Sequence, residues 1–384
     1  MSAIIHDFRI EAAVVAPVRS YRSIALLRVI VAILVVAHHA IPAIAGLSPA
    51  WSGFATGGLF MTPAGRIEFF FVASALLIWL RHHDDLGNSD RLQPFLWRRL
   101  SGIYPLYWIV LASLLIFGAT IGFRSASYPS TTTILAATVL VGGDLHQTPL
   151  AVAWTLFHEI MFYAAFACGI FNVRLGLCVA VGWLALVAAQ AFGLGLPGVP
   201  DYVGSSLNLL FLFGIGGAAW LRSGRSVPVM PLGIAVLAAA AILLWENVQL
   251  QTLPMAVVSL AWGLLWAVAL TVAVAFERRH RIKLPASLLT LSDASFMLYL
   301  LHYPLLSQLV HFMRIFRQDW AGPTSPGVVL AMIAGTCIAT AVVAHRSIEI
   351  PLRSWLRRLS IDRSRPANSG HRWQTEIGKI KSWS

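Results

Sequence analysis

The chain has little charge. Only 11% of its 384 residues are Asp, Glu, Lys or Arg, 58% are hydrophobic, and the mean hydropathy is +0.75. A soluble domain has about 25% charged residues. The three cysteines all lie in apolar segments, so no disulfide framework is indicated. No internal repeat is visible, which disfavours the inverted-repeat transporter folds. These features predict an all-α polytopic membrane protein.

Acidic residues are scarcer than basic ones. The chain has 16 Asp and Glu against 28 Lys and Arg, which gives a formal net charge of +12. Nucleic-acid-binding proteins also have such an excess, but here the basic residues lie between and after the apolar runs and do not line one surface. Their placement instead indicates the basic cytoplasmic loops of a membrane protein.

Ten apolar segments are predicted to be transmembrane helices, and most have the length of about 20 residues that a bilayer requires. They are 24–45, 65–80, 104–123, 152–171, 175–195, 204–221, 229–245, 254–276, 288–312 and 327–345. An eleventh apolar run, 134–141, is too short. Counting it as a span would place the basic cluster 278–283 outside, against the positive-inside rule. We therefore interpret 130–150 as an outer loop that can dip into the bundle.

The resulting topology places both termini in the cytoplasm. It divides the chain into a cytoplasmic N-terminal segment (1–20), a transmembrane domain (21–346) and a basic cytoplasmic tail (347–384). In the tail, residues 351–361 alternate Leu, Trp and Ile with Arg, as interfacial basic helices do. We expect the last dozen residues to be disordered, and the first apolar segment to be retained, because about twenty mixed residues precede it.

Ionisable side chains within the apolar segments are the candidate functional residues, because a buried charge in a membrane is costly and usually marks a functional site. Arg28 and His39 are eleven residues apart, about 16 Å along one face of a helix. The predicted topology sorts the polar residues by depth. It places His39, Glu68 and Glu159 in the outer half, His302 and Ser74 at mid-depth, and Arg28, Arg98 and Arg99 at the cytoplasmic mouth.

A cavity with cations at one end and an imidazole with carboxylates at the other suits acyl transfer. Guanidinium groups bind phosphates bidentately, and an imidazole oriented by a carboxylate can deprotonate a hydroxyl nucleophile. Coenzyme A has phosphates at one end and a thioester on a flexible arm about as long as the separation of Arg28 and His39. The placement favours an acyl-CoA donor from the cytoplasm and a hydroxyl acceptor from outside.

Six strings of the chain, from about residue 21 to 358, resemble segments of acyltransferase family 3, the ten-span bacterial O-acyltransferases of polysaccharides and lipopolysaccharide. In order, they are LLRVIVAILVVAHH, IEFFFVASALLI, FLWRRLSGIYPLYW, WTLFHEIMFY, FMLYLLHYPL and IEIPLR. The first string aligns Arg28 with the family's arginine and His39, not His38, with its catalytic histidine. Three positions depart from the family pattern: Glu68 replaces Asp, Ala75 replaces Gly, and Gly102 replaces an arginine.

The resemblance implies a bacterial inner-membrane enzyme that transfers an acyl group, expected to be acetyl, from acyl-CoA to a hydroxyl of an extracytoplasmic glycan, without a metal. His39 is then a general base or a transient acyl carrier, which Glu68 or Glu159 orients. Coenzyme phosphates are expected at Arg28, Arg98 and Arg99. The residues expected to bind substrate are Ser74, Trp154, Tyr163 and His302.

Other classes of function remain open from the residues alone. A transporter or flippase of a lipid-linked or anionic solute would use His39, Glu68 and Glu159 as a proton relay. A membrane sensor without catalytic activity is a third possibility. Covalent modification of a glycan distinguishes an acyltransferase from a transporter and from a sensor.

Each candidate residue also has a structural interpretation. His39 can be a hydrogen-bonded core histidine, or with His302 or His158 it can ligate haem or a metal, although no Cys or carboxylate cluster supports such a site. Arg98 and Arg99 can be topogenic charges beside lipid headgroups.

Overall fold

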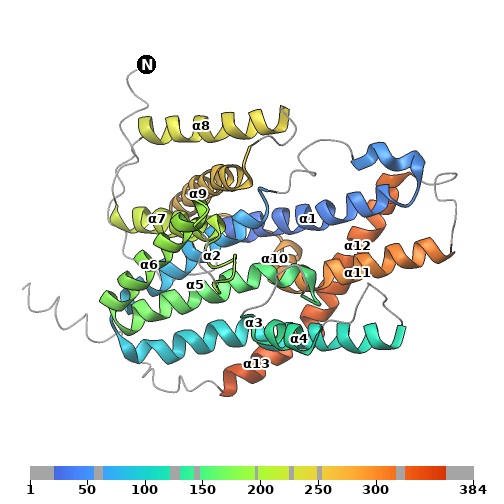
Figure 1. Cartoon of the computed structure of the whole chain (residues 1–384), viewed down its shortest axis with the longest axis horizontal. Coiled ribbons are helices and arrows are strands. Elements are labelled where there is room, and N and C mark those ends of the chain that lie inside the picture. The colour runs from blue at the N-terminus through green and yellow to red at the C-terminus, as the bar shows by residue number, and fades with distance from the viewer. Residues whose placement is uncertain are drawn as a thin grey trace, which may run out of the picture.

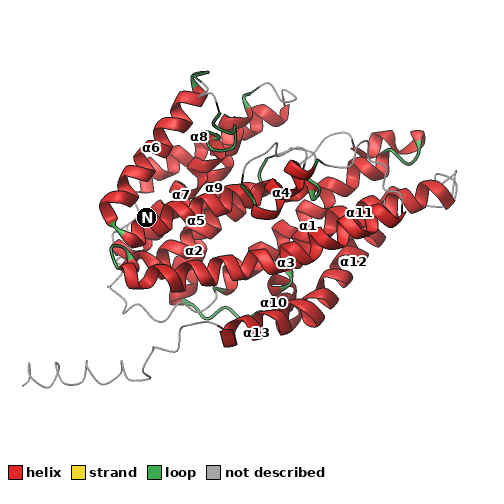
Figure 2. Cartoon of the chain, turned by 60° about the horizontal axis from the view of Figure 1, so that its bottom comes forward, coloured by secondary structure: helices red, strands yellow, loops and turns green. Residues whose placement is uncertain are grey.

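The computed structural model describes residues 21–55, 64–121, 130–141, 148–194, 198–224, 229–248, 253–316 and 325–359. Within these ranges all regular structure is helical, as predicted (Figure 2). The predicted N-terminal segment 1–20 and the last dozen residues lie outside the described residues.

Each of the ten predicted segments overlaps a helix. The longer helices are α1 (Arg22–Ala45), α2 (Ile67–His82), α3 (Leu92–Ile121), α5 (Trp154–Phe171), α6 (Val173–Ala191), α7 (Leu209–Ser223), α8 (Val229–Val248), α9 (Met255–Arg279), α11 (Ser295–Phe316) and α12 (Pro326–Ala344). Six described segments, containing α1, α3, α5, α6, α9 and α12, are long and apolar enough to cross a membrane. The count of ten spans stays a prediction.

Segments that the topology assigns to the cytoplasm meet at one end of the bundle. At the start of α1, the backbone N–H of Arg22 donates to Glu277 near the end of α9 at 2.7 Å, and the Ser23 hydroxyl donates to the same carboxylate at 2.6 Å. The start of α1 and the end of α9 therefore lie on the same side. The predicted topology, with 134–141 as a loop, also places these two ends together, and the number of spans stays a prediction.

Most of the apolar run 134–141 lies in a short helix, α4 (Thr131–Val139), that packs along α3 (Figure 1). The last carbonyls of a helix have no partners within it. Here the side chains of Tyr104, Tyr107 and Trp108 donate to carbonyl oxygens of residues 137–139 at 2.6–2.8 Å. Because irregular backbone in a membrane must be satisfied by protein, these bonds let α4 end beside α3, as predicted for a dipping loop.

The centre of the bundle is α2, which packs closely against α7 and α9, while α1 packs against α11 and α12. Small residues permit the close approach of α2 and α7. A Cβ at Gly214 would lie 2.3 Å from the carbonyl oxygen of Val72. As in other membrane bundles, glycine at the contact brings two backbones together. At the edge, α8 packs against α9 (Figure 1).

Two predicted boundaries differ from the structure. The segment 288–312 is not one helix, since α10 (Ala286–Asp293) ends before α11 begins. After α12, one π-helical turn (His345–Glu349) leads into α13 (Ile350–Leu359), which corresponds to the predicted basic interfacial helix. In α13, Trp355 is 56% exposed.

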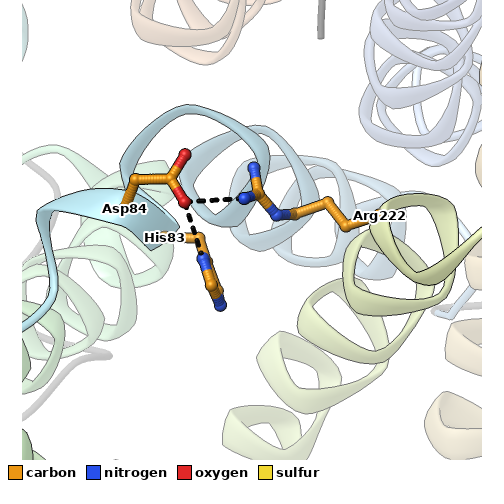
Figure 3. A network of polar contacts seen from close by, with 3 residues as sticks. All are labelled: His83, Asp84 and Arg222. Carbon is orange, nitrogen blue, oxygen red and sulfur yellow. Dashed lines mark hydrogen bonds and ion pairs between the residues drawn. The ribbon is translucent and has the colours of Figure 1, made fainter. Parts of the chain in front are cut away.

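A polar network ties the loop after α2 to the end of α7 (Figure 3). The Asp84 carboxylate accepts from the His83 ring at 3.2 Å and from Arg222 Nη2 at 2.7 Å. The His83 hydrogen bond and then the Arg222 charge hold the pKa of Asp84 below its ordinary value. The resulting stabilisation is therefore present at neutral pH and is lost as the pH falls through this lowered pKa. It is small, since the carboxylate is 74% exposed.

The end of the bundle where the start of α1 meets the end of α9 allows a test of the protein's orientation in the membrane. In a cysteine-free background we expect a membrane-impermeant maleimide to label Val199→Cys on intact spheroplasts but not His280→Cys, because basic loops stay in the cytoplasm. After permeabilisation both variants should react, which controls for access. Labelling of His280→Cys from outside would show that the predicted topology is inverted.

Candidate active site

His39 lies in the last two turns of α1, and its ring orientation is fixed by its own helix. Ring Nδ1 is 2.9 Å from the carbonyl oxygen of Val35, one turn earlier. A carbonyl only accepts, so Nδ1 carries the proton and Nε2 presents its lone pair. The neutral imidazole is therefore in the tautomer that a general base needs.

A second histidine faces His39 from α11. The ring centroids of His39 and His302 are 5.2 Å apart, and Tyr303 lies 5.4 Å from His39. His302 Nδ1 is 2.8 Å from the carbonyl of Tyr299, so it too is protonated at Nδ1. Its Nε2 is buried and has no hydrogen-bond partner among the described residues. Two imidazoles from different helices thus meet with accepting Nε2 atoms, and His302 also lines a small cavity of about 10 Å³.

Glu68 does not contact His39 directly, in contrast to the expectation that a carboxylate orients the ring. The Glu68 carboxylate is buried and accepts from the Gly65 backbone N–H at 2.7 Å and the Ser259 hydroxyl at 2.8 Å. The turn before α2 requires glycine, because Gly65 has a φ of +100° and a Cβ there would lie 2.7 Å from the Trp262 ring. Glu68 thus joins the start of α2 to α9.

Arg66 connects this carboxylate to the histidines. It interacts electrostatically with Glu68 and with His39. Its guanidinium donates to His38 Nδ1 at 2.9 Å, so His38 is an acceptor there. The neighbouring histidines therefore have different environments: His38 is held by a cation, whereas His39 is held by a backbone carbonyl. This supports the distinction that the sequence draws between them.

Glu159 belongs to a second polar cluster, deeper in the bundle. The hydroxyls of Ser74 and Tyr163 both donate to its Oε1, the latter at 2.5 Å. Three residues expected at the site, on α2 and α5, are therefore in direct contact. Neither carboxylate, however, is hydrogen-bonded to His39 among the described residues.

Arg99 lies beside this cluster and also interacts with Arg81 near the end of α2. Its guanidinium carbon is 5.7 Å from the ring centroid of Tyr163, and it interacts electrostatically with Glu159. Tyr163 is eight residues from the end of α5 at Phe171, about 12 Å into the bundle. The Arg99 side chain is half-buried beside this cluster, and among the described residues its buried Nε has no hydrogen-bond partner. Its planar guanidinium is suited to stacking on aromatic faces.

Other arginines collect in two groups toward the end that the predicted topology assigns to the cytoplasm. Arg81, on α2, interacts electrostatically with Arg98 and Arg99 on α3. Arg28, on α1, interacts with Asp293 and Arg353. Because α13, which carries Arg353, contacts α3, the tail helix lies between the two groups.

Trp154 lies apart from the histidine pair, at the start of α5. Its ring is 5.9 Å from that of His158. The next residue, Thr155, bonds the Tyr299 hydroxyl at 2.7 Å. Since Tyr299 lies 6.4 Å from His302, α5 is connected to the histidine pair through α11.

No catalytic or coenzyme-binding role was predicted from the sequence for Arg66, Arg81 or Arg353. The spacing along α2 could have indicated Arg81 as a site residue. It lies seven residues, or two turns, after Ser74 and so shares its face of the helix. Arg66 precedes α2 and meets His38 only through tertiary packing, so no local pattern indicates it. Arg353 lies four residues after Glu349, the i,i+4 spacing of an ion pair, and their side chains meet at 2.6 Å.

Metal ligation was also considered for the histidines. Among the residues that the structure describes, no group of three or more His, Cys, Asp or Glu is arranged to hold a metal ion.

A helical bundle with apolar spans and buried ionisable groups defines the chain as an integral membrane protein. The profile of the acyltransferase domain family matches residues 21–344, so the chain belongs to acyltransferase family 3. The exopolysaccharide production protein ExoZ of Rhizobium meliloti (strain 1021) is 27% identical over 195 residues, which cover 48% of this chain and 58% of that protein. No solved structure matches the chain.

The Glu159 cluster gives a stability prediction. Ser74→Ala removes a donor from a carboxylate inside the bundle, and an unsatisfied buried group costs about 1–3 kcal/mol. We expect the thermal midpoint of the detergent-solubilised protein to fall. The matched control is Ser113→Ala on α3, because that hydroxyl donates to the Ile109 carbonyl of its own helix. Equal midpoints for both variants would show that the Ser74 bond contributes nothing.

Proposed function

We propose that the protein is an inner-membrane O-acyltransferase that moves an acyl group, expected to be acetyl, from cytoplasmic acyl-CoA to a hydroxyl of an extracytoplasmic glycan. The observation that carries the proposal is the His39 tautomer, which presents Nε2 as an acceptor beside a second imidazole, in a chain of an acyltransferase family. The name of ExoZ, an exopolysaccharide production protein, supports a polysaccharide acceptor.

In the proposed reaction His39 Nε2 takes the proton of the acceptor hydroxyl while the hydroxyl oxygen attacks the thioester carbonyl carbon. The carbon–sulfur bond then breaks, and the thiolate of coenzyme A leaves with the proton that His39 returns. The products are a glycan ester and the free thiol. The Val35 carbonyl stabilises the imidazolium formed midway, because Nδ1–H stays hydrogen-bonded to it.

The remaining residues have supporting roles in this proposal. Glu68 acts on the histidines through Arg66, and Glu159 acts through the polar cluster that it forms with Ser74 and Tyr163. His302 and Trp154 contact the substrate. Coenzyme phosphates bind the cytoplasmic arginines expected from the sequence, Arg28, Arg98 and Arg99, with Arg81 added from the structure.

A transporter or flippase with a His39, Glu68 and Glu159 proton relay is the second candidate. The separation of Glu68 from Glu159 into different clusters provides no continuous relay among the described residues. Mass spectrometry of cell-envelope glycans, with and without the gene, decides between the two. Ester groups that depend on the gene support transfer, whereas unchanged glycans with altered solute movement support transport.

The role of His39 is tested by substitution. His39→Ala should lower kcat by about 10²–10⁴-fold, the usual effect of losing a general base. The control is His38→Ala, which removes the neighbouring ring and should have a milder effect. Transfer of labelled acetyl groups from acetyl-CoA to glycan in purified membranes measures both, with expression and thermal midpoint checked. Equal loss in the two variants, or full activity of His39→Ala, would contradict the assignment.

The coenzyme site is tested at its arginines. Because each charge-assisted hydrogen bond contributes about 1.5–3 kcal/mol, the variant with both Arg98→Gln and Arg99→Gln should raise the KM for acetyl-CoA at least about tenfold. The acceptor KM should change little. Arg99→Gln alone should also lower the thermal midpoint, since Arg99 faces Tyr163.

Arg174→Gln, at the exposed start of α6, is the matched control for loss of a basic residue near the predicted cytoplasmic surface. An unchanged KM in the double variant would mean that Arg98 and Arg99 serve topology only.

A further inference from the structure

A cavity of about 650 Å³ opens at the end of the bundle that the topology places outside. Its lining includes Trp154, His158, Gln190, Asp201, Tyr202 and Ser205. The volume is within the range of about 300–1,000 Å³ typical of small-molecule sites. The cavity does not include His39 or His302, so it is distinct from the histidine pair.

The wall of this cavity is held rigid by a buried hydrogen-bond system. The Asn208 side-chain amide donates to the carbonyls of Tyr202 and Val203 at 2.8 and 3.0 Å. Its Oδ1 accepts from His158 Nδ1 at 2.7 Å. From α6, Trp183 Nε1 donates to the Val203 carbonyl at 2.7 Å. These bonds fix the segment after α6 against α5, so the polar groups of the cavity are preorganised.

The chemistry of the lining selects the kind of ligand. Trp154 and Tyr202 provide aromatic surface, while Gln190, Asp201 and Ser205 provide hydrogen-bonding groups. A sugar ring has an apolar face and a rim of hydroxyls, which such a combination matches. Among the described lining residues there is no Lys or Arg, and one is an acid. This disfavours a phosphate or a lipid headgroup that carries one, because guanidinium and ammonium groups are what bind such anions.

We propose that this cavity is a glycan-binding subsite that holds an uncharged sugar of the acceptor chain next to the one that is acylated. The inference rests on the proposed acyltransferase function and adds a second site of acceptor recognition. The positions of the lining residues on α5 support a subsite that is separate from the histidine pair. On α5, Trp154 and His158 are four residues apart and line the cavity, whereas Thr155 and Glu159 form the adjoining face and contact α11 and α2. A chain of sugars, unlike a single one, can reach both faces.

The test uses the full-length protein in detergent and the polysaccharide of the strain that carries the gene, partially hydrolysed to oligosaccharides and single sugars. Saturation-transfer NMR measures binding without catalysis, and transfer from acetyl-CoA measures the acceptor KM. Trp154→Ala removes the aromatic surface. Gly204→Ala displaces the Gln190 side chain, since a Cβ there would lie 1.9 Å from Gln190 Oε1. Trp245→Ala, on an exposed site of α8, is the control for loss of a tryptophan.

We expect both cavity variants to raise the oligosaccharide KM about two- to tenfold and to weaken the NMR signal, while the KM for acetyl-CoA stays constant. The acceptor KM of single sugars should not change in Gly204→Ala, because a single acceptor sugar does not have to occupy the cavity. Unchanged oligosaccharide binding in folded Gly204→Ala would overturn the proposal, as would an equal rise of the acceptor KM for single sugars. If wild-type protein binds oligosaccharides but acylates none, the acyltransferase function fails and the glycan site stands.

Discussion

This bundle depends on one constraint: its buried ionisable groups must be paired with hydrogen-bond donors or with opposite charges. An unpaired charge in an apolar interior is costly, so each carboxylate must find donors. Glu68 finds them in a backbone N–H and a serine of α9, and Glu159 finds them in two hydroxyls with Arg99 nearby. Each cluster joins helices far apart in the sequence. The polar residues therefore fix the packing of α2 as well as the chemistry around it.

The same constraint determines the state of the histidines. The imidazoles of His39 and His302 each donate to a carbonyl of their own helix, which needs no partner from elsewhere and leaves Nε2 accepting. Two neutral rings can then face each other without repulsion. A carboxylate hydrogen-bonded to His39 would favour the imidazolium, whereas a backbone carbonyl keeps a neutral base and still supports it on protonation. The geometry thus favours a base that gains and releases one proton in each cycle.

Much of the architecture follows from the sequence, because apolar length and basic loops are local signals. They located the helices, and the interpretation of 134–141 as a loop between spans stays a prediction. The break between α10 and α11 was missed, since hydropathy is continuous across it. For the site, spacing along a helix predicted the residues but not their partners. The contact of His39 with His302, and that of Arg99 with Tyr163, arise from packing between helices that no sequence period encodes.

Two adjacent faces of helix α5 contribute to different parts of the structure. Its residues 154 and 158 line the outer cavity, and residues 155 and 159 contact α11 and α2. The two faces are adjacent because successive helix positions are about 100° apart. A shift or rotation of α5 would therefore change the cavity and the Glu159 cluster together. Because Thr155 bonds Tyr299, and Tyr299 lies beside His302, occupancy of the cavity has a contiguous physical route to the histidine pair.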